Sequence, residues 1–185
     1  MSIRRFVFSK TFLKTILVVG GSLGAKSINE SILTNLSLIR ESSFQLIWQT
    51  GSTYYNVIQS KKLESTNIKI LPFIDRMDLA YSVADVIISR AGAIAISELC
   101  VVGKPLILVP SPNVVDDHQT KNAQDVLKKN ACLVVNDYKA KDILLKEAIN
   151  LLNDNNKLML ISSNLKELAK PNASKNIVNE LYNLL

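Results

Sequence analysis

With 185 residues, 48% of them hydrophobic, the chain can bury the core of one domain, and its longest apolar stretches fall well short of the roughly 20 residues of a membrane-spanning helix, which leaves a soluble or peripheral protein. The formal net charge of +6 comes from residues 1–76, which hold ten Lys and Arg against four Asp and Glu, whereas residues 77–185 hold twelve of each class. No basic strand with interleaved aromatics and no arginine-rich helix accompanies this excess, which argues against nucleic acid and leaves a solvated basic face or an anionic membrane surface.

From Thr15 onward, short apolar runs alternate with segments of helical spacing. The runs predict strands at 15–19, 44–49, 67–71, 85–89, 105–110 and 131–135. The segments that follow them predict helices at 25–39, 53–62, 76–83, 93–102, 117–129 and 139–152. Because parallel strands need crossover connections, this alternation predicts the α/β class, with a Rossmann-like six-stranded parallel sheet covered by helices on both faces.

The two ends of the chain differ from this pattern. Two helical patterns at 155–169 and 173–184 have no strand between them, and Pro171 marks a break because its ring disfavours helical geometry at the preceding residue. The predicted division is a linker or truncated lead-in at 1–14, a sheet domain at 15–152 and a helical C-terminal tail at 153–185.

Glycines and polar side chains gather in the loops that follow the predicted strands. These loops are GGSLGA (20–25), QTGS (49–52), PFIDRM (72–77), SRAGA (89–93) and SPNVVDDHQTKNA (111–123). Ligands of open parallel sheets bind beyond the carboxyl ends of the strands, where such loops converge. We therefore expect one ligand site at this edge.

Two of the loops bring a helix N-terminus to that edge. The glycine loop is either a tight turn only, or it presents the backbone of Gly21 and the hydroxyl of Ser22 to an anion. In the SRAGA loop, Gly92 and Ala93 keep the approach free of large side chains, and Arg90 either adds a cation or forms a surface ion pair. Two helix ends of this kind can share a diphosphate.

Glu98 is the only residue of the predicted helix 93–102 that is charged at neutral pH. It shares a narrow face with Ala91 and Ala95, whose small side chains leave room for a ribose diol that a carboxylate can bind by charge-assisted hydrogen bonds. The structural alternative is a carboxylate that reaches solvent or pairs with Lys104.

The two remaining loops carry candidate contacts for a base and a sugar. Phe73 and Ile74 present apolar surface and backbone groups suited to a planar base, with core packing as the alternative for Phe73. Asp75 is a candidate cap for the next helix. His118 and Gln119 lie in a dense polar cluster that suits sugar hydroxyls, although a lone histidine is often only a structural hydrogen-bonding group.

Few residues suggest other chemistry. His118 is the only histidine and has no cysteine near it, so no metal is predicted, and no Ser/His/Asp nucleophile motif is present. Cys100 and Cys132 lie inside apolar runs, where reduced cysteine behaves as a small hydrophobe. We therefore expect a reducing, cytoplasmic compartment and no cofactor.

Five segments, VVGGSLGAKSINE, FIDRM, SRAGAIAISEL, GKPLILVP and DDHQTKNA, in this order and spacing, resemble the C-terminal domain of the MurG family over about residues 14–185. That family comprises UDP-N-acetylglucosamine:undecaprenyl-pyrophosphoryl-muramoyl-pentapeptide N-acetylglucosaminyltransferases of bacterial peptidoglycan synthesis. The resemblance implies the C-terminal half of an inverting GT-B glycosyltransferase, peripheral on the inner face of the plasma membrane. It also implies that residues 15–152 hold the donor, UDP-GlcNAc.

The resemblance implies a role for each candidate residue of the donor site. Ile74 would contact uracil through its backbone beside Phe73, and Glu98 would hold the ribose hydroxyls. The diphosphate would meet Ser22 and the 92–95 loop, which contains Gly92, Ala93 and Ile94. His118 and Gln119 would contact the N-acetylglucosamine.

The family's N-terminal domain, which has the acceptor loop and a membrane-facing surface, has no counterpart in this sequence. The resemblance thus implies that the catalytic base and the lipid-linked acceptor belong to that missing domain, and that no catalytic residue lies on this chain. An alternative is a nucleotide-sugar-binding subunit that is active only with a separate membrane-associated partner, as in the two-subunit transferase that builds dolichol-linked chitobiose. A UDP-sugar epimerase of similar architecture would need acid–base carboxylates and a fuller N-terminal domain.

Overall fold

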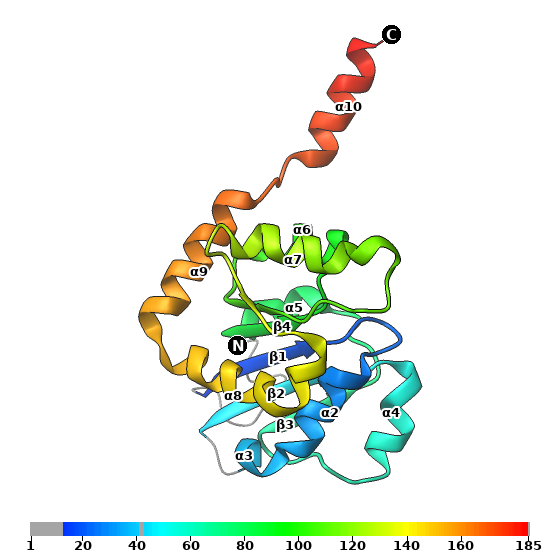
Figure 1. Cartoon of the computed structure of the whole chain (residues 1–185), viewed down its shortest axis with the longest axis vertical. Coiled ribbons are helices and arrows are strands. Elements are labelled where there is room, and N and C mark those ends of the chain that lie inside the picture. The colour runs from blue at the N-terminus through cyan, green and yellow to red at the C-terminus, as the bar shows by residue number, and fades with distance from the viewer. Residues whose placement is uncertain (1–12, 41–42, 185) are drawn as a thin grey trace.

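Six parallel strands form one sheet in the order β3-β2-β1-β4-β5-β6 in the computed structural model, which describes residues 13–40 and 43–184 (Figure 1). The strands are β1 (Lys14–Val19), β2 (Phe44–Gln49), β3 (Ile68–Leu71), β4 (Val86–Ser89), β5 (Leu106–Leu108) and β6 (Leu133–Val134). The predicted six-stranded parallel sheet is confirmed. The last two strands are shorter than predicted; Pro105 and Pro110, which have no N–H to donate, flank β5.

Helices cover both faces of the sheet. They are α2 (Lys26–Thr34), α3 (Leu36–Arg40), α4 (Ser52–Gln59), α5 (Met77–Val83), α6 (Ala93–Val102), α7 (His118–Leu127), α8 (Ala140–Asn153), α9 (Asn155–Leu168) and α10 (Ala173–Asn183). Helices α2 and α8 lie side by side on one face, and α5, α6 and α7 lie on the other (Figure 1). Because both faces are covered, the strands read as continuous apolar runs in the sequence.

One predicted helix, 25–39, is divided at Asn35. The side-chain nitrogen of Asn35 donates hydrogen bonds to the carbonyl oxygens of Ser31 (2.8 Å) and Lys141 (3.3 Å). The first bond competes with regular helix geometry and the second joins this turn to α8. A contact with a distant segment therefore ends α2 where the apolar spacing alone predicts continuation.

A buried polar link fixes α2 against the end of β2. The side chains of Trp48 and Asn29 are almost fully buried. Trp48 Nε1 donates to Asn29 Oδ1 (2.9 Å), and Asn29 Nδ2 donates to the carbonyl oxygen of Thr50 (2.9 Å). This link satisfies the indole N–H and sets where the glycine loop before α2 can lie.

The C-terminal segment has two unlike parts. Helix α9 contacts both α8 and α6, and its residues Ile161 and Leu165 are buried. Helix α10 has no buried residue and projects away from the sheet domain (Figure 1). Across residues 13–40 and 43–184, no helix combines the length and apolarity needed to cross a bilayer.

Two further predictions concern the start of the chain and the thiols. Most of the predicted lead-in, residues 1–12, lies outside the described residues, and Lys14 already begins β1. Cys100 and Cys132 are free and buried, and burial raises the pKa of both thiols, that of Cys132 to about 12. They pack as apolar side chains.

Candidate functional site

The loops after β1 and β2 touch through their backbones at the carboxyl edge of the sheet. Gly24 has a φ of +88°, and a Cβ there would lie 2.1 Å from the carbonyl oxygen of Thr50. The amide of Ser52 also donates to the carbonyl oxygen of Ser22 (3.1 Å). Both the close approach and the φ require glycine at position 24. The contact holds the exposed tip, Gly21 and Ser22, at this edge.

Gln49, the last residue of β2, joins the glycine loop to the turn after β3. Its side chain is almost fully buried. Gln49 Nε2 donates to the carbonyl oxygen of Gly21 (3.0 Å), and Gln49 Oε1 accepts from the backbone N–H of Ile74 (2.9 Å). The resemblance implies that the backbone of Ile74 meets a base; its N–H is bonded to Gln49 and its side chain is buried, so such a contact would use the carbonyl oxygen. Phe73, which is 53% exposed, presents the surface that remains.

Replacing Gln49 with leucine should lower the free energy of unfolding by about 1–3 kcal/mol, because the buried N–H of Ile74 would lose its acceptor. Urea unfolding followed by the fluorescence of Trp48 measures this change. Gln59→Leu is the matched control, since the buried Oε1 of Gln59 has no hydrogen-bond partner among the described residues. Equal stability of the two variants would show that Gln49 is not a structural link.

The N-terminus of α6 lies at the same edge. The helix begins at Ala93 with Gly92 as its N-cap, and neither a side-chain cap nor an acidic residue occupies its first turn. Ala93 and Ile94 are exposed, and a Cβ on Gly92 would meet nothing within 4 Å. The first N–H groups of a helix lack partners within the helix and form the positive end of its dipole, so this opening suits an anion.

Glu98 lies on the exposed side of α6, and its partner is a tyrosine of α5. The hydroxyl of Tyr81 is 3.2 Å from Glu98 Oε2. Lys104, the alternative partner that we considered, instead donates to the carbonyl oxygen of Ser82 (3.4 Å). Burial, then the charge of Glu98 and the hydrogen bond to it, raise the pKa of Tyr81, so this phenol stays protonated at neutral pH.

Gln119 fixes the loop that leads into α6. Its Oε1 accepts from the backbone N–H groups of Ala91 (3.2 Å) and Ser111 (2.9 Å). Asn122 Nδ2 donates to the carbonyl oxygen of Ala91 (3.1 Å), so both backbone groups of this buried alanine are bonded to α7. The predicted sugar contact of Gln119 therefore has to use its side-chain nitrogen, because the oxygen is occupied.

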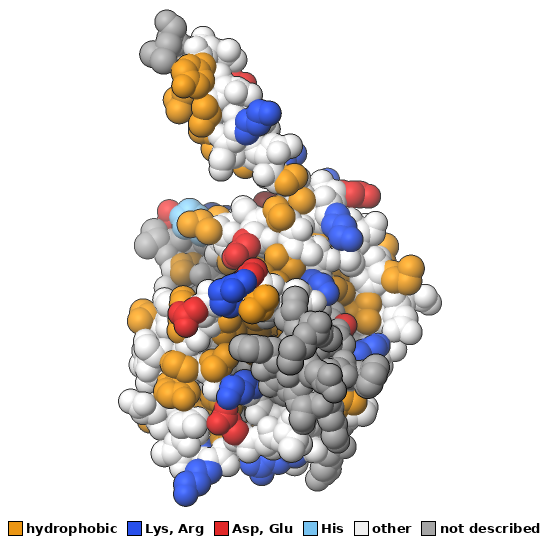
Figure 2. All heavy atoms as spheres, turned by 180° about the vertical axis from the view of Figure 1, so that it is seen from behind, with side chains coloured by type: hydrophobic (Ala, Val, Ile, Leu, Met, Phe, Trp, Pro, Cys, Tyr) orange, Lys and Arg blue, Asp and Glu red, His pale blue; other side chains and the backbone are white. Residues whose placement is uncertain are grey.

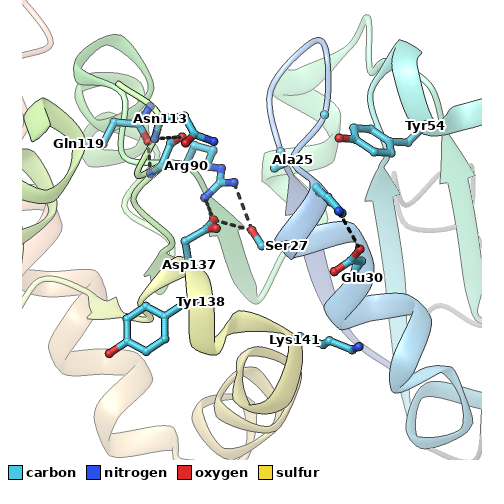
Figure 3. Close-up of a pocket in the computed structure, with 14 residues that line it drawn as sticks. Ala25, Ser27, Glu30, Tyr54, Arg90, Asn113, Gln119, Asp137, Tyr138 and Lys141 are labelled. Atoms are coloured by element: carbon cyan, nitrogen blue, oxygen red, sulfur yellow. Dashed lines mark hydrogen bonds and ion pairs between the residues drawn. The ribbon is translucent and has the colours of Figure 1, made fainter. Parts of the chain in front are cut away.

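Of the two alternatives for Arg90, an added cation and a surface ion pair, the structure shows an ion pair, and a largely buried one. Figure 3 shows its guanidinium turned toward Asp137 and Ser27, with which it forms an ion pair and a hydrogen bond of 3.2 Å, respectively. It also donates to the carbonyl oxygen of Val109 (3.0 Å). The side chains of Arg90 and Asp137 are only 17% and 23% exposed. The charge is thus neutralised inside the fold, where it joins β4, α2 and the segment before α8.

A cavity of about 620 Å³ lies beside this ion pair, and the glycine loop after β1, polar residues of α2 and polar residues of the loops after β5 and β6 line it (Figure 3). Arg90 and Gln119 belong to its lining, but Phe73, Ile74 and Glu98 do not. The predicted site residues therefore divide between two regions: this cavity, on the side of α2 and α8, and the open surface over α5 and α6. The loop containing Arg90 connects the two regions.

His118 is the first residue of α7 and is largely exposed. Its Nε2 lies 3.8 Å from a carboxylate oxygen of Asp116, and His118 is not among the residues that line the 620 Å³ cavity.

Two other predictions concern the helix after β3 and metal binding. Helix α5 begins at Met77 with Arg76 as its N-cap, so Asp75 is not the N-cap of this helix. Within residues 13–40 and 43–184, no group of three His, Cys, Asp or Glu side chains could hold a metal ion.

Three residues at this edge were not singled out from the sequence: Gln49, Tyr81 and Asp137. Gln49 had a detectable signal, because it is the polar end of an otherwise apolar strand. Tyr81 and Asp137 had none, since their partners lie 17 and 47 positions away in the chain.

Comparisons with known proteins identify the family to which this chain is similar. Residues 15–180 match the family model described as the glycosyltransferase family 28 C-terminal domain. The chain is 45% identical over 176 residues to the UDP-N-acetylglucosamine–N-acetylmuramyl-(pentapeptide) pyrophosphoryl-undecaprenol N-acetylglucosamine transferase of Cytophaga hutchinsonii, covering 95% of this chain and 47% of that protein. The transferase of the same name from Porphyromonas gingivalis is 44% identical over 186 residues, covering 100% of this chain and 49% of that protein.

Among solved structures, the crystal structure of Acinetobacter baumannii MurG superposes with a TM-score of 0.81 at 32% identity, covering 97% of this chain and 53% of that one. The chain therefore spans about half the length of the relatives that it matches.

Proposed function

Because the chain belongs to the glycosyltransferase family 28 C-terminal domain family, we propose that it is the donor-binding half of an inverting N-acetylglucosaminyltransferase. The donor is UDP-GlcNAc, and the acceptor is undecaprenyl-pyrophosphoryl-muramoyl-pentapeptide, as the names of the relatives state for those proteins. The product is the corresponding disaccharide lipid of peptidoglycan synthesis.

The observation that carries this proposal is that Glu98 and the uncapped N-terminus of α6 both lie on one exposed surface of that helix. The helix N-terminus suits the diphosphate, and the carboxylate suits the ribose diol. Phe73, exposed at the neighbouring turn, suits the uracil ring. Gln119 lines the adjacent cavity, so the sugar end of the donor would point toward that cavity.

The chemical contribution of this half is electrostatic stabilisation of UDP as it leaves. Inverting transfer needs a base that deprotonates the acceptor hydroxyl and positive charge that stabilises the departing UDP. The N–H groups at the start of α6 supply the second, so we expect no metal and no cofactor. The candidate residues include no base, which we place on the part of the relatives that this chain does not span.

The exposed apolar residues of helix α10 indicate that a second protein region, on the same polypeptide or on a separate subunit, packs against this helix. Ile177, Val178 and Leu181 lie on this helix and are 61%, 47% and 58% exposed, and Figure 2 shows hydrophobic side chains gathered along the projecting helix. A helix whose apolar residues are all exposed needs a partner surface to bury them. The acceptor lipid would place the assembled enzyme at the inner face of the plasma membrane.

The 185-residue chain alone should bind UDP but show no detectable transfer to the lipid-linked acceptor, because the base and the acceptor site are elsewhere. Adding the amino-terminal half of the Cytophaga hutchinsonii relative should restore turnover, measured with radiolabelled UDP-GlcNAc. Deleting residues 171–185, none of which is buried in the described part, should prevent that restoration and leave UDP affinity within about twofold.

Robust turnover by the isolated chain would contradict the half-enzyme proposal. Failure to bind UDP would contradict the donor assignment itself, whatever the effect of the added half.

A further inference from the structure

Tyr81 and Glu98 connect two helices at the exposed surface over α5 and α6. Tyr81 lies near the end of α5, which is anchored by the buried side chains of Ala80 and Val83. Its hydroxyl is 3.2 Å from Glu98 Oε2. An ionised carboxylate can only accept hydrogen bonds, so the phenol is the donor.

Because Tyr81 is protonated, its hydroxyl is always the donor of this hydrogen bond and Glu98 the acceptor. Burial of the ring, the nearby charge of Glu98 and the hydrogen bond to it raise the pKa of Tyr81. A phenol of ordinary pKa is already protonated at neutral pH, and the raised pKa of Tyr81 extends its role as donor to more alkaline pH.

The bond restricts a side chain that has no other hydrogen-bond or ion-pair partner within residues 13–40 and 43–184. Glu98 is exposed on α6 and has three rotatable torsions, so ordering it for a ligand costs conformational entropy. The contact with Tyr81 engages Oε2, which leaves Oε1 and a second lone pair of Oε2 for other donors. These are the acceptors that two neighbouring hydroxyl groups of a ribose need.

The position of Tyr81 also couples two parts of the nucleoside surface. The turn that contains Phe73 leads directly into α5, and Tyr81 lies on that helix. Its contact with Glu98 therefore ties the candidate base surface to the candidate ribose contact on α6.

We propose that Tyr81 is a positioning residue, which holds the carboxylate of Glu98 in the orientation that binds the ribose hydroxyls of the donor. This inference rests on the proposed donor function and names a residue through which it acts. Tyr81 itself contacts no donor atom in this account.

The test is a calorimetric titration of the whole 185-residue chain with UDP and with 2′,3′-dideoxy-UDP. Tyr81→Phe keeps the ring and removes the hydroxyl, and should weaken UDP binding about 3- to 10-fold through the lost ordering of Glu98. It should leave the affinity for the dideoxy nucleotide unchanged, because that ligand has no ribose diol. Tyr55→Phe, at a half-buried tyrosine of α4, is the matched control and should change neither affinity.

A Glu98→Gln background sharpens this test. There the further change Tyr81→Phe should weaken UDP binding less than it does in the wild type, because the two side chains act as a pair. Equal losses for UDP and the dideoxy nucleotide would reduce Tyr81 to a packing residue, and no loss for either would also overturn the proposal.

A readout without ligand separates this inference from the proposed function. The ¹³C NMR shift of the Glu98 carboxyl carbon should move in Tyr81→Phe and stay in Tyr55→Phe. If the wild type bound no UDP, the donor function would fall, and this shift would still decide whether Tyr81 orients Glu98. An unmoved shift would overturn the positioning role.

Discussion

Glu98→Ala should weaken the binding of UDP about 10- to 150-fold, which corresponds to about 1.5–3 kcal/mol for the loss of a charge-assisted hydrogen bond. The carboxylate lies on the exposed surface that also contains the N-terminus of α6, and Tyr81 donates to only one of its oxygens. Isothermal titration calorimetry of wild type and variant measures the difference. No other acid lies on α6, so another residue of this helix cannot replace it.

Glu167→Ala is the control for this experiment, because Glu167 is an exposed glutamate near the end of α9. Its removal changes the net charge equally and should leave UDP affinity unchanged. If both variants bound UDP as the wild type does, Glu98 would not belong to the site. If both lost affinity equally, the effect would be one of net charge.

Arg90→Met should lower the free energy of unfolding by about 2–4 kcal/mol, somewhat less than the loss of a partner in a fully buried pair. The change leaves the carboxylate of Asp137 in a partly buried position without its cation. It also removes the donors to Ser27 Oγ and to the carbonyl oxygen of Val109. Urea denaturation gives the stability of each variant.

Arg76→Met is the matched control, since Arg76 forms its ion pair with Asp78 on an exposed surface. Solvent screens that pair, and the variant should unfold almost as the wild type does. A loss of UDP affinity in Arg90→Met at unchanged stability would reverse our interpretation and return Arg90 to the diphosphate. Equal stability of the two variants would likewise contradict the structural role.

Most of the fold could be predicted because it depends on local patterns. The limits of β2 at 44–49 and of α6 at 93–102 agree with the apolar spacing, since both are bounded by turn residues or glycines in the sequence. The helix predicted at 25–39 ends early because Asn35 bonds to α8, a partner that no local pattern reveals. Where the prediction from local patterns was wrong, as at the end of α2, a tertiary contact determines the limit of the element.

The loops at the carboxyl edge of the sheet could be predicted from the sequence, but the partners of their side chains could not. The edge follows from the loops after each strand, and α6 begins directly after the loop that follows β4. The charge of Arg90 is neutralised by Asp137, which is 47 positions away in the chain. The environment of Arg90 therefore depends on where the fold places the segment between β6 and α8. The same holds for the N–H of Ile74, which Gln49 occupies from another strand.

The most direct test of the donor account is a ¹⁵N NMR titration of the chain with UDP, with every amide shift assigned. We expect the largest changes on Phe73, on residues 92–94 and on Glu98, over the surface formed by α5 and α6. Changes confined to the 620 Å³ cavity beside α2 and α8, or no change at saturating UDP, would contradict it.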